Sequence, residues 1–124
     1  MAKKKLTKKQ EDLVERLRDI GVDRPVALTL VYVAGTDECI RTDVEGATGL
    51  KQPEVSIATM YLRDEGWIDK TERKKEGKGR PVHVYSLSKP VGEVFGDILE
   101  KERARISDRE ENLKKIEDVV KEIY

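Results

Sequence analysis

The sequence has very few of the residues on which catalytic and metal sites depend. Its 124 residues include one cysteine, Cys39, and one histidine, His83. A single cysteine excludes an intramolecular disulfide and a cysteine-based zinc site. A Ser-His-Asp or Cys-His arrangement would have to use His83, which alternates with Val82 and Val84 and is expected to face solvent or phosphate. We therefore expect no enzymatic activity, no cofactor and no metal ion. Cys39 reads as a small buried residue beside Ile40 in preference to a redox sensor.

Long apolar runs and a net charge are absent as well. No apolar stretch approaches the ~20 residues that a membrane helix needs, and no apolar region follows the lysine-rich start. The 25 Lys and Arg residues balance the 25 Asp and Glu residues. With 37% hydrophobic and 5% aromatic residues, the chain can build one modest core. We expect a cytoplasmic protein that has no membrane partner.

The first third of the sequence predicts two helices and a short strand. Thr7 can cap a helix that Gly21 ends. Pro25 starts the next helix, which is apolar almost all round and is therefore expected to be central. Gly35 lies at its end. Residues 39–41 are then expected to form a short strand that pairs with a later hairpin.

Residues 42–66 predict two short helices joined by a tight turn. Thr42 and Glu45 have the spacing of a capping box that opens the first helix. Gly49 closes it, and Leu50 follows as the buried residue of the turn. Gln52 is expected to be the N-cap of the second helix, because the proline after it is tolerated in a first helical turn. This helix is expected to continue to residue 65, before a glycine.

The period changes from helical to alternating at Trp67, so residues 67–73 and 82–87 predict two strands of a hairpin. Between them lies the basic, glycine-containing loop 74–81. Two short helices followed by a hairpin with a cationic tip are the outline of a winged helix-turn-helix, a fold that binds DNA. The predicted fold is mainly α, with a small β-hairpin wing and a long C-terminal helix.

Several motifs also resemble a known group of proteins. The turn and second helix resemble those of archaeal and bacterial winged-helix regulators of the MarR, ArsR and TrmB-like families, through Gly49 to Ser56, Leu62, Gly66, Trp67 and Ile68. The GRPxxxY pattern of Gly79, Arg80, Pro81 and Tyr85 is similar to the wing of the archaeal TrmB-like group. The resemblance covers roughly residues 7 to 100 and departs at Thr59, where these families generally place Leu. We expect no counterpart of the sugar-binding domain of full-length TrmB regulators, and therefore no sugar response.

The second helix of the pair is the candidate recognition helix. Val55, Ala58 and Leu62 fall on one face and are expected to be core, whereas Thr59 is expected to be exposed. The candidate DNA-binding residues of this helix are Lys51, Gln52, Ser56, Ile57, Met60, Tyr61 and Arg63. Gln52 could bond an adenine edge and Ile57 could touch a thymine methyl, while Ser56 and the other polar groups could hold the DNA backbone.

Residues of the loop 74–81 are the candidate wing contacts. Arg80 is expected to enter a minor groove, with Lys75 and Lys78 beside it as phosphate contacts. Positive charge is concentrated in this region and at the start of the chain: residues 1–18 carry seven positive and three negative groups, and residues 70–81 carry six positive and two negative. Residues 90–124 carry seven positive and ten negative. A DNA-binding protein would show this separation, although lysine-rich loops also serve solubility alone.

The last third of the sequence, from Pro90 to Tyr124, reads as one long helix or as two helices broken near Ile106, where Ser107 and Glu110 have capping-box spacing. Apolar residues there follow the spacing of a coiled-coil seam, interrupted by charged residues. The expected dimerisation residues are Leu99, Ile106, Leu113, Ile116, Val120 and Ile123. A second copy of the chain is the favoured partner for this seam, and the first helix of the same chain is the alternative.

We therefore divide the chain into a basic disordered arm (1–6), a winged helix-turn-helix DNA-binding domain (7–89) and a C-terminal helical dimerisation segment (90–124). The favoured function is a sequence-specific transcriptional regulator that binds double-stranded DNA as a homodimer at a pseudo-palindromic operator. The alternative is a non-enzymatic protein-interaction module of a transcription or assembly complex, which an exposed Ile57 and Met60 would suit. Glu54, Asp64 and Glu65, which oppose phosphate, leave both open. The sequence identifies no small-molecule effector.

Overall fold

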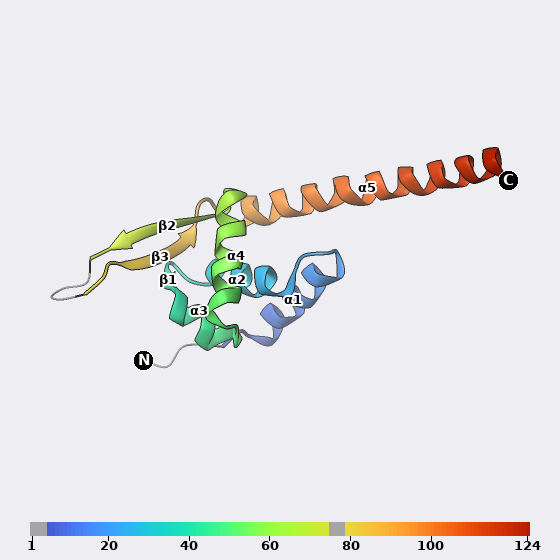
Figure 1. The fold of residues 1–124 in the computed structure, drawn as a ribbon. Helices are drawn as coiled ribbons and strands as arrows, with labels where there is room; N and C mark the ends of the chain where they lie inside the picture. The colour runs from blue at the N-terminus through green and yellow to red at the C-terminus, as the bar shows by residue number, and fades with distance from the viewer. Residues whose placement is uncertain (1–4, 75–78) are drawn as a thin grey trace. The chain divides into compact units, whose positions relative to one another are not determined.

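The computed structural model describes residues 5–74 and 79–124. The chain forms two compact units, Met1–Val91 and Gly92–Tyr124, each of which is treated by itself below. The elements, labelled in Figure 1, are α1 (Lys8–Asp19), α2 (Arg24–Ala34), β1 (Cys39–Ile40), α3 (Arg41–Thr48), α4 (Gln52–Asp64), β2 (Ile68–Arg73), β3 (Val82–Leu87) and α5 (Val91–Ile123).

Helix α1 begins where the sequence predicted. The Thr7 hydroxyl accepts a hydrogen bond from the Gln10 N–H at 3.1 Å, and the Gln10 side chain accepts one from the Thr7 N–H at 2.8 Å. This reciprocal pair satisfies two N–H groups that a helix start leaves without intrahelical partners. Val14 and Leu17 form the buried face of the helix.

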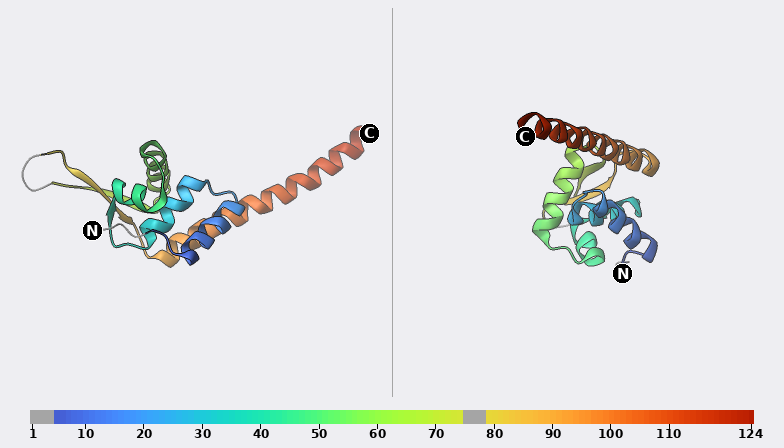
Figure 2. Two further views of the ribbon diagram at one scale, coloured as in Figure 1. Left: turned by 90° about the horizontal axis from the view of Figure 1, so that it is seen from below. Right: turned by 90° about the vertical axis from the view of Figure 1, so that its right-hand side faces the viewer.

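Helix α2 is the centre of the first unit. It contacts α1, α3 and α4, beside which it lies in Figure 2, and its residues Val26 to Val31 and Val33 are buried. The prediction of a central apolar helix is confirmed. A helix that is hydrophobic all round must be covered on all sides, so the three neighbouring helices take their positions from it.

The three strands form an antiparallel sheet in the order β1-β3-β2. Cys39 lies opposite Tyr85, and the hairpin pairs Ile68 with Leu87 through to Arg73 with Val82. The predicted pairing of the short strand with the hairpin is confirmed. Trp67, expected in the hairpin, lies just before β2: its N–H bonds the Leu62 carbonyl at 3.0 Å and closes α4, and its carbonyl accepts the Ser88 N–H of the other arm at 3.0 Å.

This order of elements is a winged helix-turn-helix. Helices α3 and α4 are the helix pair, β2 and β3 are the wing, and β1 is the short strand that joins the wing to the helices. The predicted fold class is confirmed, including a long helix at the C-terminus.

Helix α5 is one continuous helix of 33 residues, so the alternative of two helices broken near Ile106 is wrong. Ser107 lies within the helix and caps nothing. Every residue from Arg103 to Tyr124 is exposed, including the apolar ones. None of the helices in the described ranges is long and apolar enough to cross a lipid bilayer.

Thr29 is a polar residue in an apolar setting. It is fully buried in α2, and its hydroxyl has no hydrogen-bond partner within the described part of the chain. An unsatisfied buried hydroxyl costs about 1 to 3 kcal/mol, whereas an apolar group of the same shape avoids that cost.

We expect Thr29→Val to raise the free energy of unfolding by about 1 kcal/mol, measured by urea denaturation with an unchanged m-value. Thr29→Ser is the matched control. It keeps the hydroxyl and removes a methyl group, so it should destabilise the protein. A valine variant less stable than the wild type would show that the hydroxyl contributes to folding.

Candidate nucleic-acid interface

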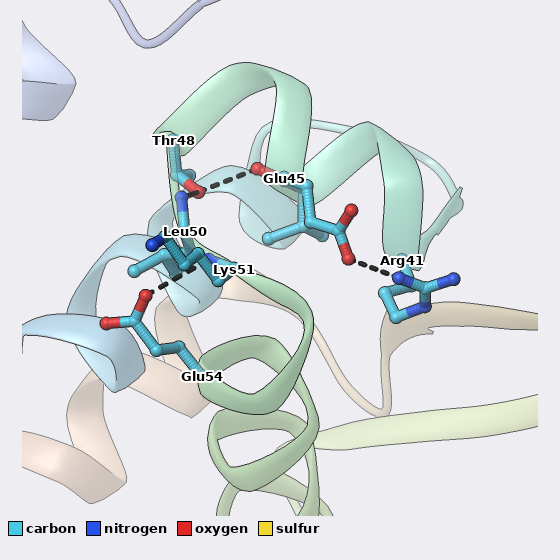
Figure 3. A network of polar contacts seen from close by, with 7 residues as sticks. Arg41, Glu45, Thr48, Leu50, Lys51 and Glu54 are labelled. Carbon is cyan, nitrogen blue, oxygen red and sulfur yellow. Dashed lines mark hydrogen bonds and ion pairs between the residues drawn. The ribbon is translucent and has the colours of Figure 1, made fainter.

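Helix α3 starts two residues earlier than the sequence predicted. The Asp43 carboxylate accepts a hydrogen bond from the Ile40 N–H at 3.0 Å, so Ile40 is the N-cap and Arg41 the first helical residue. The expected capping box of Thr42 and Glu45 is therefore wrong. Glu45 pairs with the Arg41 side chain, one turn before it on the same helix (Figure 3).

The turn between α3 and α4 has the geometry that the sequence predicted. Gly49 adopts a φ of 80°, a left-handed conformation that glycine reaches without strain. The Thr48 hydroxyl donates to the Val44 carbonyl at 2.7 Å and accepts from the Leu50 N–H at 3.2 Å. Leu50 is buried, so the turn is fixed both by hydrogen bonds and by packing.

Helix α4 has Lys51 as its N-cap, so the expectation that Gln52 fills that position is wrong. The Glu54 carboxylate accepts the Lys51 N–H at 3.0 Å and sets the helix start at Gln52 (Figure 3). Pro53 then lies at the second helical position, where a missing N–H is still tolerated. The consequence for function is that the Gln52 side chain does not cap the helix.

The exposure of α4 follows the prediction with one exception. Val55, Ala58 and Leu62 are buried as expected. Thr59 is also buried, contrary to expectation, because its hydroxyl donates to the Ser56 carbonyl at 3.1 Å and so remains satisfied inside the protein. The seven candidate DNA-binding residues of this segment, Lys51, Gln52, Ser56, Ile57, Met60, Tyr61 and Arg63, are all exposed.

A groove of about 450 Å³ lies between the helix pair and the wing. Its lining residues come from β1, α3, α4, β2, β3 and the segment before β3: Ile40, Arg41, Thr42, Gln52, Ser56, Lys70, Arg80, Pro81, Val82, His83 and Tyr85. Three of them are permanent cations, and none carries a carboxylate. Within the described ranges, Lys70 and Arg80 form no ion pair. The groove therefore suits a negatively charged ligand.

The groove brings together some of the predicted site residues and leaves others apart. It joins Gln52 and Ser56 of α4 to Arg80 before β3. The predicted contacts Lys51, Ile57, Met60, Tyr61 and Arg63 lie on α4 or at its start but do not line the groove. Lys75 and Lys78 lie outside the residues that the structure describes.

The sequence reasoning did not identify the other groove residues as site residues, among them the polar or aromatic Arg41, Thr42, Lys70 and Tyr85. Lys70 and Tyr85 lie opposite each other in the β2–β3 ladder, a pairing that the strand register reveals and that composition does not. Arg41 was assigned to a strand, so its position at the start of a helix beside the groove was not foreseen.

Two contacts connect the wing to the rest of the first unit, Arg73 with Glu38 and Trp67 with Tyr61, and a third, His83 with Glu72, lies within the wing. The Arg73 guanidinium donates two hydrogen bonds to the Glu38 carboxylate, at 2.5 and 2.9 Å, and these bonds lower the pKa of Glu38. His83 is exposed, as predicted, with its Nε2 atom 3.4 Å from the Glu72 carboxylate across the ladder. Tyr61 meets Trp67 edge to face with ring centroids 6.3 Å apart, which links α4 to the start of the wing.

Cys39 has the environment of a structural residue. It is 3% exposed, and burial raises the pKa of its thiol to about 11, although a hydrogen bond with Thr36 opposes this effect. Reactive cysteines have depressed pKa values and accessible sulfur atoms, so its interpretation as a packed residue is confirmed. In the described segments, no group of three or more His, Cys, Asp or Glu side chains is arranged to hold a metal ion.

Solved structures of similar arrangement are known. Pex from Synechococcus sp. is 20% identical, with a TM-score of 0.48 over 77% of this chain and 96% of that one. The circadian clock associated protein Pex from Anabaena is 20% identical, with a TM-score of 0.46 over 80% and 96%. Disulfide-formed AbfR is 14% identical, with a TM-score of 0.49 over 87% and 80%. No protein-family model and no curated protein matches the chain. These similarities assign neither a family nor a function.

We expect the Cys39 thiol of the native protein to react with a disulfide reagent such as DTNB much more slowly than the thiol of the protein unfolded in guanidinium. Because the folded pKa is about 11 against an ordinary value of 9.0, the unfolded thiol ionises first as the pH rises. Stability should therefore decline above about pH 9. Cys39→Ala should abolish the reaction with DTNB. Equal rates for native and unfolded protein would revive the redox-sensor interpretation.

Proposed function

We propose that this protein is a sequence-specific DNA-binding transcriptional regulator that acts as a homodimer at a pseudo-palindromic operator. The groove between α4 and the wing is the observation that carries this proposal. It gathers Lys70, Arg80 and Arg41 around the exposed side chains of Gln52 and Ser56. Cations attract the phosphate backbone, and the helix beside them presents polar groups that can reach base edges.

The groove supports a division of roles among its residues. Lys70 supplies positive charge, Arg41 supplies guanidinium N–H groups although Glu45 pairs with its charge, and Thr42 and Ser56 supply hydroxyl groups, so these four suit phosphate oxygens. Gln52 is exposed at the first position of α4, where its amide can form two bonds with an adenine edge. Arg80, in the segment leading into β3, suits the narrow minor groove beside the helix site.

The exposed apolar residues of α5 support the homodimer. Leu99, Ile106, Leu113, Ile116, Val120 and Ile123 are each between 42% and 64% exposed. Soluble proteins rarely leave such a continuous apolar stripe in water, and a second copy of the same helix covers it most simply. Two linked domains would then bind two half-sites.

The second candidate is a protein-interaction module without enzymatic activity. Ile57 and Met60 are 68% and 58% exposed on α4, and large exposed apolar side chains are common in protein interfaces. The two functions differ in whether the purified protein retains DNA.

We expect the purified protein to retain genomic DNA fragments at low salt. For a dimer with several phosphate contacts in each subunit, the log-log slope of affinity against salt should have a magnitude of about five or more, since each neutralised phosphate contributes roughly 0.9. Fluorescence anisotropy across a salt series measures this slope. Failure to retain any duplex at low salt would end the DNA-binding proposal and favour the interaction module.

Single substitutions of groove residues should each change a different property of DNA binding. Lys70→Ala should weaken binding to all sequences and reduce the slope by about one, whereas Arg80→Ala should cost about 1 to 3 kcal/mol, most on A·T-rich flanks. Gln52→Ala should relax the preference at one base position only. Lys114→Ala, on α5 and outside the groove, is the matched control and should behave like the wild type.

We expect the wild type to sediment as a dimer at micromolar concentration, and the Leu113→Lys, Ile116→Lys double variant to be monomeric. The two lysines place charge in the apolar stripe, where they repel their counterparts. Specific DNA binding should weaken greatly, because a lone domain is not reinforced by the second half-site. Asn112→Lys puts the same side chain at an exposed polar position and should remain dimeric. A monomeric wild type would refute the homodimer and the palindromic operator.

A further inference from the structure

The exposed side of α4 carries an apolar ridge, defined here as Ile57 and Met60. Their exposed fractions are 68% and 58%, and they lie three residues apart, so they are neighbours on the helix surface. With about 100° of rotation per residue, both lie on the side of α4 opposite the buried Val55 and Leu62. The ridge is therefore the part of α4 that reaches furthest from its own core.

The ridge continues the helix surface that lines the groove. Ser56 lies in the groove beside Arg80 and immediately precedes Ile57, and it lies one turn before Met60. A ligand that lies along α4 from the groove would therefore meet polar side chains first and the apolar ridge next.

Charge near the ridge argues against contact with phosphate at this point. Asp64 is exposed one turn after Met60, and Glu54 lies three residues before Ile57 on the same helix. These carboxylates repel the DNA backbone, whereas the cations of the groove attract it. If DNA lies in the groove, the middle of α4 faces base edges.

Base edges in the major groove offer one apolar feature, the C5-methyl group of thymine. We propose that Ile57 and Met60 are specificity residues that contact thymine methyl groups, so the operator carries thymines at the positions facing the middle of α4. This inference rests on the proposed function. The amide of Gln52 would recognise a hydrogen-bonding pattern. The ridge would be a second determinant of specificity, which recognises shape and apolar surface.

The test uses DNA that differs only in the methyl group. Duplexes are first selected by the wild-type protein from random sequences, and the preferred site is then synthesised with 2′-deoxyuridine in place of thymidine. Uracil keeps the base pairing and lacks the methyl group. We expect the wild type to bind the uracil duplex more weakly, by about fourfold for each thymine methyl that the ridge buries, as expected for the burial of one methyl group.

The variants assign this effect to the ridge. Ile57→Ala and Met60→Ala should bind the thymine duplex more weakly than the wild type does, and the double variant should bind the thymine and uracil duplexes equally. Leu13→Ala, which shortens an apolar side chain exposed to 36% on α1, is the matched control and should keep the full sensitivity to uracil. Circular dichroism confirms that each variant retains its helices.

The outcomes separate this inference from the function on which it rests. Equal affinity of the wild type for both duplexes, or a uracil effect that survives in the double variant, would overturn the inference and leave DNA binding intact. Selected sites without thymine opposite α4 would overturn it too. No retained DNA in the selection would refute the proposed function, and with it this role of the ridge, in favour of a protein partner.

Discussion

The packing of α4 on α2 is the contact on which the rest of the structure depends. Val55, Ala58 and Leu62 of α4 are buried, and α2 is the helix that α4 contacts most extensively. A helix has one orientation about its axis once its apolar stripe is buried. This packing therefore determines that Gln52 and Ser56 line the groove.

The elements were predictable from the sequence because their signals are local. The cap at Thr7, the turn at Gly49 and Leu50, and the alternation within β2 and β3 are patterns of a few residues, and each forms what it predicts. Where two local signals competed, the predicted N-cap was wrong by two positions for α3 and by one position for α4. Asp43 and Glu54 each accept the N–H of the residue three positions before them, which moved both helix starts away from the expected caps.

The groove was less predictable than the helices, since it is made by residues far apart in the chain. Lys70 enters it through the register of β2 on β3, and Arg41 enters it because α3 starts directly after β1. Thr59 illustrates the same limit for burial. Its hydroxyl is satisfied by the backbone of its own helix, so a polar residue occupies the core at little cost. The oligomeric role of the exposed stripe on α5 and the DNA contacts remain predictions.

The strand pairing determines how firmly the wing is attached to the rest of the first unit. Strand β1 pairs with only two residues of β3, Val84 and Tyr85, while the β2–β3 ladder continues to the pair of Arg73 with Val82. The outer part of the hairpin is therefore attached to the sheet at one end only, and the bond of Arg73 to Glu38 is its lateral contact with the segment before β1. Because this bond is exposed, it adds little to the stability of the fold. Its main effect is instead to restrain the orientation of the hairpin, so we expect loss of the Glu38 charge to let β2 and β3 tilt more freely relative to the helices.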